Sequence, residues 1–439
     1  MSKIKNFSWG NYPYFAQKPM EVHWRTELSS IIHKIKSDEK STLVYGKGRS
    51  YGDSCLAKSN EVISTINLNN IISVDWEKGL ITAEAGITLE EILSFSIPNG
   101  WFLPVSPGTK FITLGGAIAN DIHGKNHHKR GTFGNHVLNI GLFRSDLGNL
   151  ICNPNLNSNL FSTTIGGLGL TGVIKWAEIK MVRISSSSIM KFSKCFHNLE
   201  EFFNLSSYYD DKYEFSVSWV DCLASKSKLG KGIYMAGNFA NDGRLRINKK
   251  SKFHIPFTPP FSLVNKLSLK TFNTFYWLLS RYKQGYSSTN YDPFFYPLDS
   301  ISRWNRIYGL KGFQQYQLVI PEESAKKGVK EVLRIISKAK TGSFLAVLKK
   351  FGKIKSPGLL SFPLPGTTLA LDFPQSIEPE KKLFPLINDV VKDYGGRLYP
   401  AKDAQMSSEF FKSSYPLWER LENERDPVLF SHFWDRVLK

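Results

Sequence analysis

The chain has 439 residues, more than an ordinary domain of about 100–200 residues, so two domains are expected. An apolar content of 41% supports a sizeable core and excludes a disordered or collagen-like chain. Lys and Arg exceed Asp and Glu by 57 − 38 = 19, which indicates an anionic partner such as nucleic acid, a phosphorylated ligand or an acidic membrane, or else a basic background composition.

The N-terminus and the cysteines bear on the compartment. Residues 1–9 include lysines but no apolar run follows them, so we expect no cleaved signal peptide. No apolar run approaches the length of about 20 residues that crosses a bilayer, so we expect a protein that is cytoplasmic or peripheral to the inner membrane, on either face. The four cysteines form no CxxC pair, which predicts neither a disulfide framework nor a zinc site: Cys55, Cys152, Cys195 and Cys222.

Residues 42–180 are rich in short strands and glycine turns. A strand over 42–45 runs into a glycine loop, and a second strand is predicted over 62–68. A hairpin is expected over 71–85, and the Thr88 cap with Glu91 predicts the start of a helix.

The serine tract 185–188 is predicted to be a hinge, because the composition changes beyond it. Apolar residues at helical spacing predict a surface helix over 322–340, and alternating residues over 345–373 predict strands of a second sheet. The end of the chain, 407–439, is expected to be helical.

The first candidate site is the loop from Gly46 to Asp53. Its three glycines flank Arg49 and Ser50, so backbone N–H groups can converge on a phosphate. The loop matches neither the P-loop nor a GxGxxG turn that opens a helix, so a Rossmann site is not supported. A plain tight turn is the alternative.

The second candidate is the segment 104–136. Gly115 and Gly116 let the backbone approach a flat or phosphorylated ligand closely. Four of the nine histidines fall in this segment: His123, His127, His128 and His136. They have no carboxylate or cysteine partners at the spacing of a metal site, so no metal is predicted. Capping of turns remains an alternative role for these histidines.

These two segments, with the turn 166–172, resemble the FAD-binding domain of the vanillyl-alcohol oxidase or PCMH-type flavoproteins. The chain is most similar among them to the decaprenylphosphoryl-β-D-ribose 2′-oxidases, the flavin subunits of an epimerase. That resemblance spans nearly the whole chain and includes 121–128, 304–306, 315–321, 360–363 and 396–403. It implies an α+β, two-domain PCMH-type fold with a substrate domain built on an antiparallel sheet.

The resemblance implies an FAD domain over 1–187, a substrate domain over 188–396, and a C-terminal segment, 397–439, that completes the FAD domain. It also implies noncovalent FAD, because relatives that tether the flavin carry His where this chain has Arg49. The expected FAD contacts are Gly46, Lys47, Gly48, Arg49, Ser50, Tyr51, Gly52, Asp53, Ser54, Gly108, Thr113, Leu114, Gly115, Gly116, Asn120, Asp121, Ile122, His123, Ile174 and Tyr399.

The implied chemistry is oxidation of the 2-hydroxyl of a polyprenyl-phospho-ribose to the 2-keto sugar, with hydride leaving for the flavin. By resemblance, the catalytic residues are His123, Lys402 and Tyr51, and Lys402 lies where negative charge develops on reduction. The expected sugar-phosphate contacts are Lys125, Tyr296, Gln315, Gln317, Lys349 and Lys402. Thr368 and Ala370 differ from the residues expected in mycobacterial relatives, so the sugar and lipid stay open.

The expected partners are a lipid-linked sugar phosphate, an NADH-dependent short-chain reductase that completes the epimerisation, and an anionic membrane, but no nucleic acid. The membrane expectation rests on 244–283, where lysines alternate with aromatic residues, although a solvated basic face is an alternative. Two other functions stay open: a soluble sugar or aldonolactone oxidase that uses oxygen, and a non-catalytic nucleic-acid-binding protein.

Overall fold

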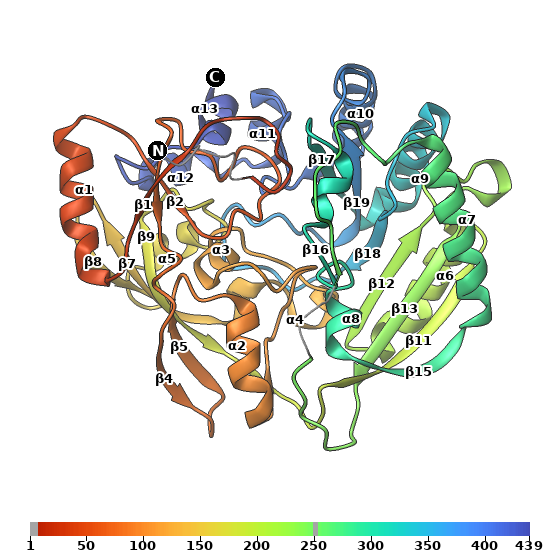
Figure 1. The fold of residues 1–439 in the computed structure, drawn as a ribbon, viewed down its shortest axis with the longest axis horizontal. Helices are drawn as coiled ribbons and strands as arrows, with labels where there is room; N and C mark the ends of the chain where they lie inside the picture. Colours follow the sequence, from red (N-terminus) through yellow and green to blue (C-terminus); the bar gives the residue numbers. More distant parts are fainter. Residues whose placement is uncertain (1–7, 249–252) are drawn as a thin grey trace.

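The computed structural model describes residues 8–248 and 253–439. Its first lobe, red to yellow in Figure 1, contains two larger sheets and a two-stranded one, in which β6 (Trp101–Phe102) pairs with β10 (Val182–Arg183). A parallel sheet has the strand order β1-β3-β2, and an antiparallel sheet has the order β4-β5-β9-β7-β8. Their bounds are β1 Lys18–Glu21, β2 Leu43–Tyr45, β3 Glu61–Ser64, β4 Ile71–Asp75, β5 Leu80–Glu84, β7 Val137–Arg144, β8 Gly148–Cys152 and β9 Val173–Lys180.

The local patterns of this lobe largely form as predicted. The hairpin β4–β5 forms, and the Thr88 hydroxyl caps the next helix by accepting from the Glu91 N–H at 3.2 Å. The strand predicted to reach Leu68 ends at Ser64, because the Leu68 N–H turns back to the Thr65 carbonyl. The helices of the lobe are α1 Leu28–Ser37, α2 Leu89–Ser96, α3 Leu114–Ala119, α4 His127–Arg130 and α5 Ser158–Thr164.

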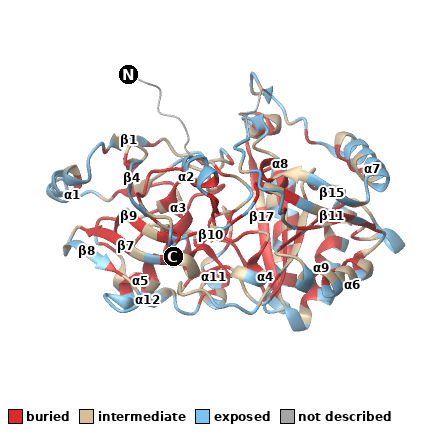
Figure 2. Cartoon of the chain, turned by 90° about the horizontal axis from the view of Figure 1, so that it is seen from below, coloured by how far each residue is buried: buried red, intermediate tan, exposed pale blue. Residues whose placement is uncertain are grey.

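The second lobe is built on one antiparallel sheet with the order β15-β11-β13-β12-β18-β19-β17-β20. Its bounds are β11 Ser188–Phe196, β12 Phe215–Val220, β13 Gly232–Phe239, β15 Gly285–Asn290, β17 Phe313–Pro321, β18 Val347–Phe351, β19 Gly366–Pro374 and β20 Arg397–Leu398. Figure 2 shows α6 (Leu199–Tyr209) and α9 (Glu322–Ala339) on one side of this sheet and α7 (Lys266–Tyr282) on the other. The remaining helices of the lobe are α8 Tyr291–Phe295 and α10 Phe384–Asp393.

Successive side chains of the central strands point alternately into the core and toward the opposite face of the sheet. On β19, Leu369, Leu371 and Phe373 lie in the core that α9 covers, whereas the intervening residues point to the opposite face. The α9 side of that core contains Val332 and Ile336, which confirms the predicted surface helix. One face of the sheet therefore stays available for a ligand.

The C-terminal segment returns to the first lobe through α11 (Ser408–Ser414), α12 (Trp418–Glu424) and α13 (His432–Leu438). The Ser431 backbone bridges to Ala57, and the His432 N–H donates to Leu56. The α+β class with an antiparallel second sheet is confirmed. The domain boundaries at 187/188 and 396/397 stay predictions. Strand β20, which begins directly after the boundary at 396/397, pairs with β17 of the second sheet.

The serine tract, predicted to be a hinge, is hydrogen-bonded to a neighbouring loop, and its role as a hinge stays a prediction. Ser186 and Ser187 are buried, and the Ser187 hydroxyl donates to the Arg246 carbonyl at 2.9 Å. The Ser185 hydroxyl donates to the Ala240 carbonyl at 3.2 Å. These bonds tie the tract to the neighbouring loop, because small hydroxyl side chains can satisfy buried backbone groups as well as form flexible linkers.

Candidate active site

A cavity of about 570 Å³ is lined by residues of both lobes. The glycine loop and the segment 106–125 line it from the first lobe, and strands β17, β18 and β19 line it from the second. Most of the predicted site residues meet here: Gly46, Lys47, Gly48, Arg49, Ser50, Tyr51, Ser54, Gly108, Thr113, Gly115, Gly116, Asn120, Ile122, His123, Lys125, Ile174, Gln315, Gln317, Lys349, Tyr399 and Lys402.

The glycine loop packs closely against the segment behind it. A Cβ on Gly46 would lie 2.4 Å from the Thr113 hydroxyl, so only glycine fits there. Opposite, a Cβ on Gly108 would meet nothing within 4 Å, because this backbone faces the open cavity. The Arg49 guanidinium lies 3.9 Å over the Trp9 ring, and burial lowers the pKa of Arg49.

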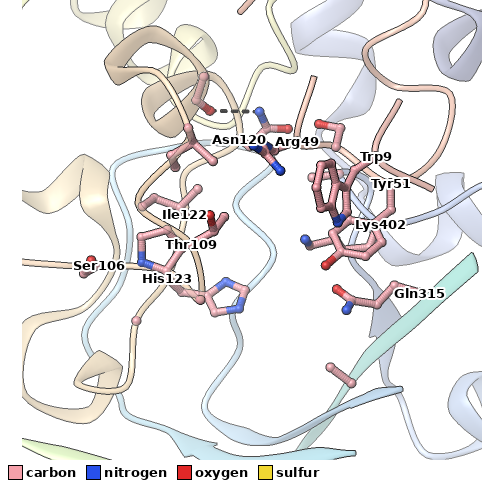
Figure 3. Close-up of a pocket in the computed structure, with 18 of the residues that line it drawn as sticks. Trp9, Arg49, Tyr51, Ser106, Thr109, Asn120, Ile122, His123, Gln315 and Lys402 are labelled. Atoms are coloured by element: carbon pink, nitrogen blue, oxygen red, sulfur yellow. Dashed lines mark hydrogen bonds between the residues drawn. The ribbon is translucent and has the colours of Figure 1, made fainter. Parts of the chain in front are cut away.

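His123 lies at the junction of the two lobes (Figure 3). Its Nε2 is 3.0 Å from the amide Nε2 of Gln317, so with the amide as donor the imidazole accepts there and carries its proton on Nδ1. Burial, followed by the charge of Lys349, holds the pKa of His123 well below its usual range. The ring is therefore neutral at physiological pH and presents a hydrogen-bond donor.

Lys402 and Tyr51 lie together on the other side of Figure 3. The Lys402 Nζ is 3.7 Å from the centroid of the Tyr51 ring, and the Tyr51 N–H donates to the Ala401 carbonyl at 3.0 Å. Burial lowers the pKa of Lys402 to about 7, while the charge of Asp372 raises it. The predicted catalytic lysine is thus a half-buried, titratable cation in the cavity wall.

Two further lysines line the sugar-facing wall. Lys125 Nζ donates to the Phe295 carbonyl at 3.0 Å, and Lys349 Nζ donates to the Gly124 carbonyl at 2.8 Å. Burial lowers the pKa of Lys125 to about 8 and that of Lys349 to about 7. Neither pairs with a carboxylate in the described part of the chain, so a bound anion would stabilise both charges.

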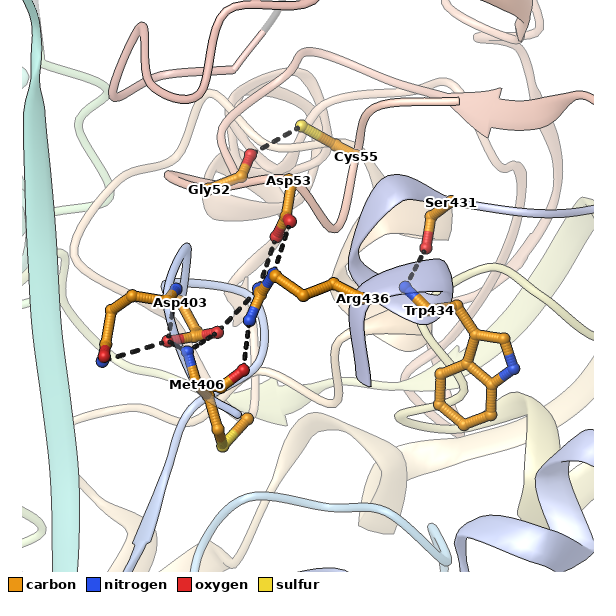
Figure 4. A network of polar contacts seen from close by, with 9 residues as sticks. Gly52, Asp53, Cys55, Asp403, Met406, Ser431, Trp434 and Arg436 are labelled. Carbon is orange, nitrogen blue, oxygen red and sulfur yellow. Dashed lines mark hydrogen bonds and ion pairs between the residues drawn. The ribbon is translucent and has the colours of Figure 1, made fainter. Parts of the chain in front are cut away.

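Gly52 and Asp53 lie beside the cavity lining rather than in it, and their contacts with FAD stay a prediction. Both Asp53 oxygens accept from the Arg436 guanidinium of α13, at 2.8 and 2.9 Å, and Arg436 also binds Asp403 at 2.9 Å (Figure 4). A Cβ on Gly52 would lie 1.7 Å from the Asp403 carbonyl oxygen. These residues join the glycine loop to the Lys402 segment, and an unpaired Asp53 carboxylate would repel a diphosphate.

Leu114, Asp121 and Tyr296 also lie outside the cavity lining. Leu114 is fully buried in the core of the first lobe. Asp121 is fully buried, and its carboxylate accepts from the Gly134 N–H at 2.8 Å and from two serine hydroxyls. The Tyr296 hydroxyl hydrogen-bonds Ser106, so it supports the wall from behind. Their side chains have structural contacts here, and their predicted ligand contacts stay predictions.

The other histidines of the second motif hold turns. The His127 Nδ1 accepts from the Gly352 N–H at 3.1 Å, and the Nε2 atoms of His128 and His136 lie 3.1 and 2.9 Å from backbone carbonyls. Among residues 8–248 and 253–439, no three His, Cys, Asp or Glu side chains are grouped to hold a metal ion.

The sequence analysis did not select several residues of the lining. They lie outside the two candidate segments and come from separate elements: Trp9, Cys55, Trp219, Asp299 and Asp372. Asp372 alone had a visible signal, because it is the one charge within the apolar alternating strand 369–373.

Comparisons with known proteins agree with this geometry. A family model described as an FAD binding domain matches residues 20–151. A decaprenylphosphoryl-β-D-ribose oxidase of Mycolicibacterium smegmatis is 35% identical over 413 residues, which cover 91% of this chain and 89% of that protein. The chain belongs to the decaprenylphosphoryl-β-D-ribose oxidase family. It is an FAD-dependent oxidoreductase.

Other members of the superfamily match shorter parts. The Delta(24)-sterol reductase of Homo sapiens is 31% identical over 117 residues, 27% of this chain and 23% of that protein. The L-gulonolactone oxidase of Mus musculus is 26% identical over 175 residues, 40% of this chain and 39% of that protein. The match to the decaprenylphosphoryl-β-D-ribose oxidase covers most of both chains, whereas the matches to the sterol reductase and the lactone oxidase cover less than half of each.

The cavity of this family member fits FAD. The Arg49 Nε and His123 Nδ1 atoms are buried without a hydrogen-bond partner in the described residues, and both side chains line the cavity. Such atoms call for a polar ligand, which a dinucleotide supplies. The glycine loop offers backbone N–H groups to a diphosphate, so the adenine-dinucleotide end belongs at this lobe.

Proposed function

We propose that this protein oxidises the 2-hydroxyl of a polyprenyl-phospho-ribose, or a similar lipid-linked sugar, to the 2-keto sugar. The observation that carries the proposal is a single cavity that joins the glycine loop to a sheet face bearing Lys125 and Lys349. A sugar phosphate bound at that face would compensate both half-buried cations while its ring lies near Lys402. Bound FAD supplies the hydride acceptor.

The residues of the cavity divide the remaining tasks. The neutral His123 donates a hydrogen bond from Nδ1, and Gln317 fixes that ring in place. Tyr51 positions the Lys402 ammonium by a cation–π contact. A fixed positive charge at Lys402 favours negative charge that develops during reduction, so this residue stabilises the transition state more than the ground state.

Anaerobic mixing with a polyprenyl-phospho-ribose tests this function. The flavin absorbance should bleach within the turnover time, and the product should contain a 2-keto sugar. Unchanged absorbance with this substrate, combined with bleaching by an aldonolactone, would instead assign the protein to the lactone oxidases.

We also propose that FAD is held without a covalent bond. Arg49 occupies the place of the histidine that tethers flavin in some relatives, and it lines the cavity. Cys55 lines the cavity too, but burial raises the pKa of its thiol to about 12, so the nucleophilic thiolate is scarce. Acid precipitation should release all yellow colour into the supernatant, and colour kept in the pellet would disprove a noncovalent link.

The product requires a second enzyme if the net reaction is epimerisation. A 2-keto sugar regains a stereocentre only when hydride is added back to C2, so an NADH-dependent short-chain reductase is the proposed partner. The pair would then feed cell-envelope polysaccharide synthesis. Product mixed with such a reductase and NADH should yield the 2-epimer, whereas recovery of the ribose alone would argue against the epimerase role.

The surface around α7 supports peripheral binding to an anionic membrane. Its outer face exposes large apolar side chains, including Leu267 (75%), Phe275 (65%) and Tyr282 (88%), and the preceding segment exposes Phe257 and Phe261. Residues 253–284 contain basic but no acidic side chains. Apolar anchors among cations are typical of helices that lie on anionic lipid.

The inner side of α7 connects this surface to the cavity. Tyr276 packs on Trp219 with ring centroids 5.0 Å apart, and both line the cavity. A lipid-linked substrate could thus reach the site from the membrane.

Lys249, Lys250 and Lys252 of the predicted basic stretch lie outside the described residues. The described helices include none that is both long and apolar enough to span a bilayer.

Vesicle cosedimentation tests the surface. Binding to anionic vesicles should exceed binding to neutral ones and should fall as salt rises. The double variant Leu267→Ser, Phe275→Ser should weaken it, whereas Leu386→Ser, at a 54% exposed position of α10, should not. Equal partitioning onto neutral and anionic vesicles would contradict this docking surface.

A further inference from the structure

A buried carboxylate in the cavity wall has no role in the function described so far. Asp372 lies on β19, is 1% exposed, and alternates with the core residues Leu371 and Phe373, so its side chain points to the cavity face. Its partner in register on β17 is Gln315, whose amide donates to the Asp372 Oδ1 at 2.6 Å. The carboxylate is therefore held in one orientation.

Charged and titratable groups from several elements face Asp372. Lys402 and Tyr51 approach from the first lobe, and Tyr308 approaches from the segment after Trp304. Burial raises the pKa of Asp372 to about 7, and the Gln315 hydrogen bond and the Lys402 charge oppose that rise. Asp372 and Lys402 thus interact electrostatically in the cavity wall, and the pKa of each is about 7.

Asp299 and His123 are two other candidate proton acceptors of the cavity. Asp299, the second carboxylate of the lining, accepts from the Lys110 N–H at 2.9 Å and lies near Arg49, at the glycine-loop side. His123 is neutral, but its Nε2 accepts from Gln317 and its other nitrogen is a donor. Asp372 instead shares the wall of β17–β19 with the residues expected to hold the sugar.

We propose that the Asp372 carboxylate accepts the proton of the sugar hydroxyl that is oxidised, with Lys402 as its counter-charge. This inference rests on the proposed function. The C2–H pair leaves as hydride to FAD, which is reduced, and the O–H proton passes to Asp372. The electron pair of the broken O–H bond forms the second bond of the new carbonyl, so charge and electrons balance.

The pH dependence has a defined sign. Only the ionised carboxylate accepts a proton, so the rate of flavin reduction should fall as pH drops through about 7. Asp372→Asn should lower that rate by about 10²–10⁴-fold and remove the acidic fall, because the titrating base is lost. Asp372→Glu should restore part of the rate. Asp389→Asn, at an exposed position of α10, should leave both rate and profile unchanged.

A second readout needs no substrate. Infrared difference spectra of the FAD-loaded protein should show a carboxylic-acid band that appears as pH falls through about 7 and that Asp372→Asn lacks. Flavin absorbance of the variant reports FAD occupancy, which should stay near that of the wild type. Occupancy that collapses in Asp372→Asn while the band persists would assign Asp372 a structural role and overturn the proposal.

The kinetic outcomes separate the two hypotheses. A wild-type protein that fails to reduce its flavin with polyprenyl-phospho-ribose overturns the proposed function. A wild-type protein that reduces its flavin, with Asp372→Asn at the same rate and with the same pH profile, overturns only the role of Asp372.

Discussion

The two walls of the cavity offer different groups to a ligand. The wall of the first lobe consists largely of glycines and small residues from two short segments, which present backbone to the ligand. The wall of the second lobe consists of charged and amide side chains, such as Lys349, Gln315 and Asp372, that alternate with core residues on three strands. Backbone recognition suits an invariant cofactor, whereas projecting side chains can adapt to a substrate and manage its proton.

The Asp53–Arg436–Asp403 cluster joins the glycine loop of the first wall to the Lys402 segment, so breaking it should have the largest effect. Arg436→Met leaves two buried carboxylates without a counter-charge, which should cost about 3–5 kcal/mol of the free energy of unfolding. Urea unfolding of the variant measures the loss. Arg420→Met, at an exposed position of α12, is the matched control, and equal midpoints for both would refute a stabilising cluster.

Removing the cation of the sugar-facing wall should affect the reaction but not the cofactor. Lys402→Ala should slow flavin reduction by about 10²–10³-fold, because a half-buried charge of the cavity wall is lost and, on the proposed mechanism, that charge stabilises the transition state. FAD occupancy should stay near wild type, since the glycine-loop wall is untouched. Stopped-flow absorbance measures the rate, with Lys338→Ala on the exposed face of α9 as control. A wild-type rate in Lys402→Ala would remove this residue from the mechanism.

A substitution in the glycine-loop wall should weaken FAD binding rather than slow the reaction. Gly46→Ala places a methyl group 2.4 Å from the Thr113 hydroxyl, and such overpacking costs about 1–3 kcal/mol. We therefore expect FAD affinity to weaken by about 5–150-fold. Titration of apoprotein with FAD measures Kd. Unchanged affinity would show that the loop moves freely, contrary to its packing.

The smallest expected effect on FAD binding concerns Trp9, whose ring lies beneath the Arg49 guanidinium. Trp9→Ala removes a cation–π contact of 3.9 Å, which contributes about 0.5–1 kcal/mol at partly exposed sites. FAD should bind about 2–5-fold more weakly, with little change in the rate of flavin reduction at saturating FAD. The same titration measures the affinity, and Trp24→Ala at an exposed position is the control. A larger fall in rate than in affinity would place Trp9 with the catalytic wall.

The sequence by itself determined the features that are local in the chain. The glycine loop, the Thr88 cap and the alternation of β18 and β19 follow from short-range sterics and periodicity, so they were predictable, as was the FAD-binding family. Even there, the ion pair of Asp53 was not predictable, because its partner Arg436 is 383 positions away.

Tertiary structure decided which side chains meet. Asp372 lies opposite Gln315 only because β19 pairs with β17 in one register, and a shift of one residue would turn it into the core. The perturbed pKa values of Lys402 and Asp372 arise from burial between two lobes, which no local pattern encodes. The chain's own residues supply the chemical groups, and the packing of distant strands gives those groups their reactivity.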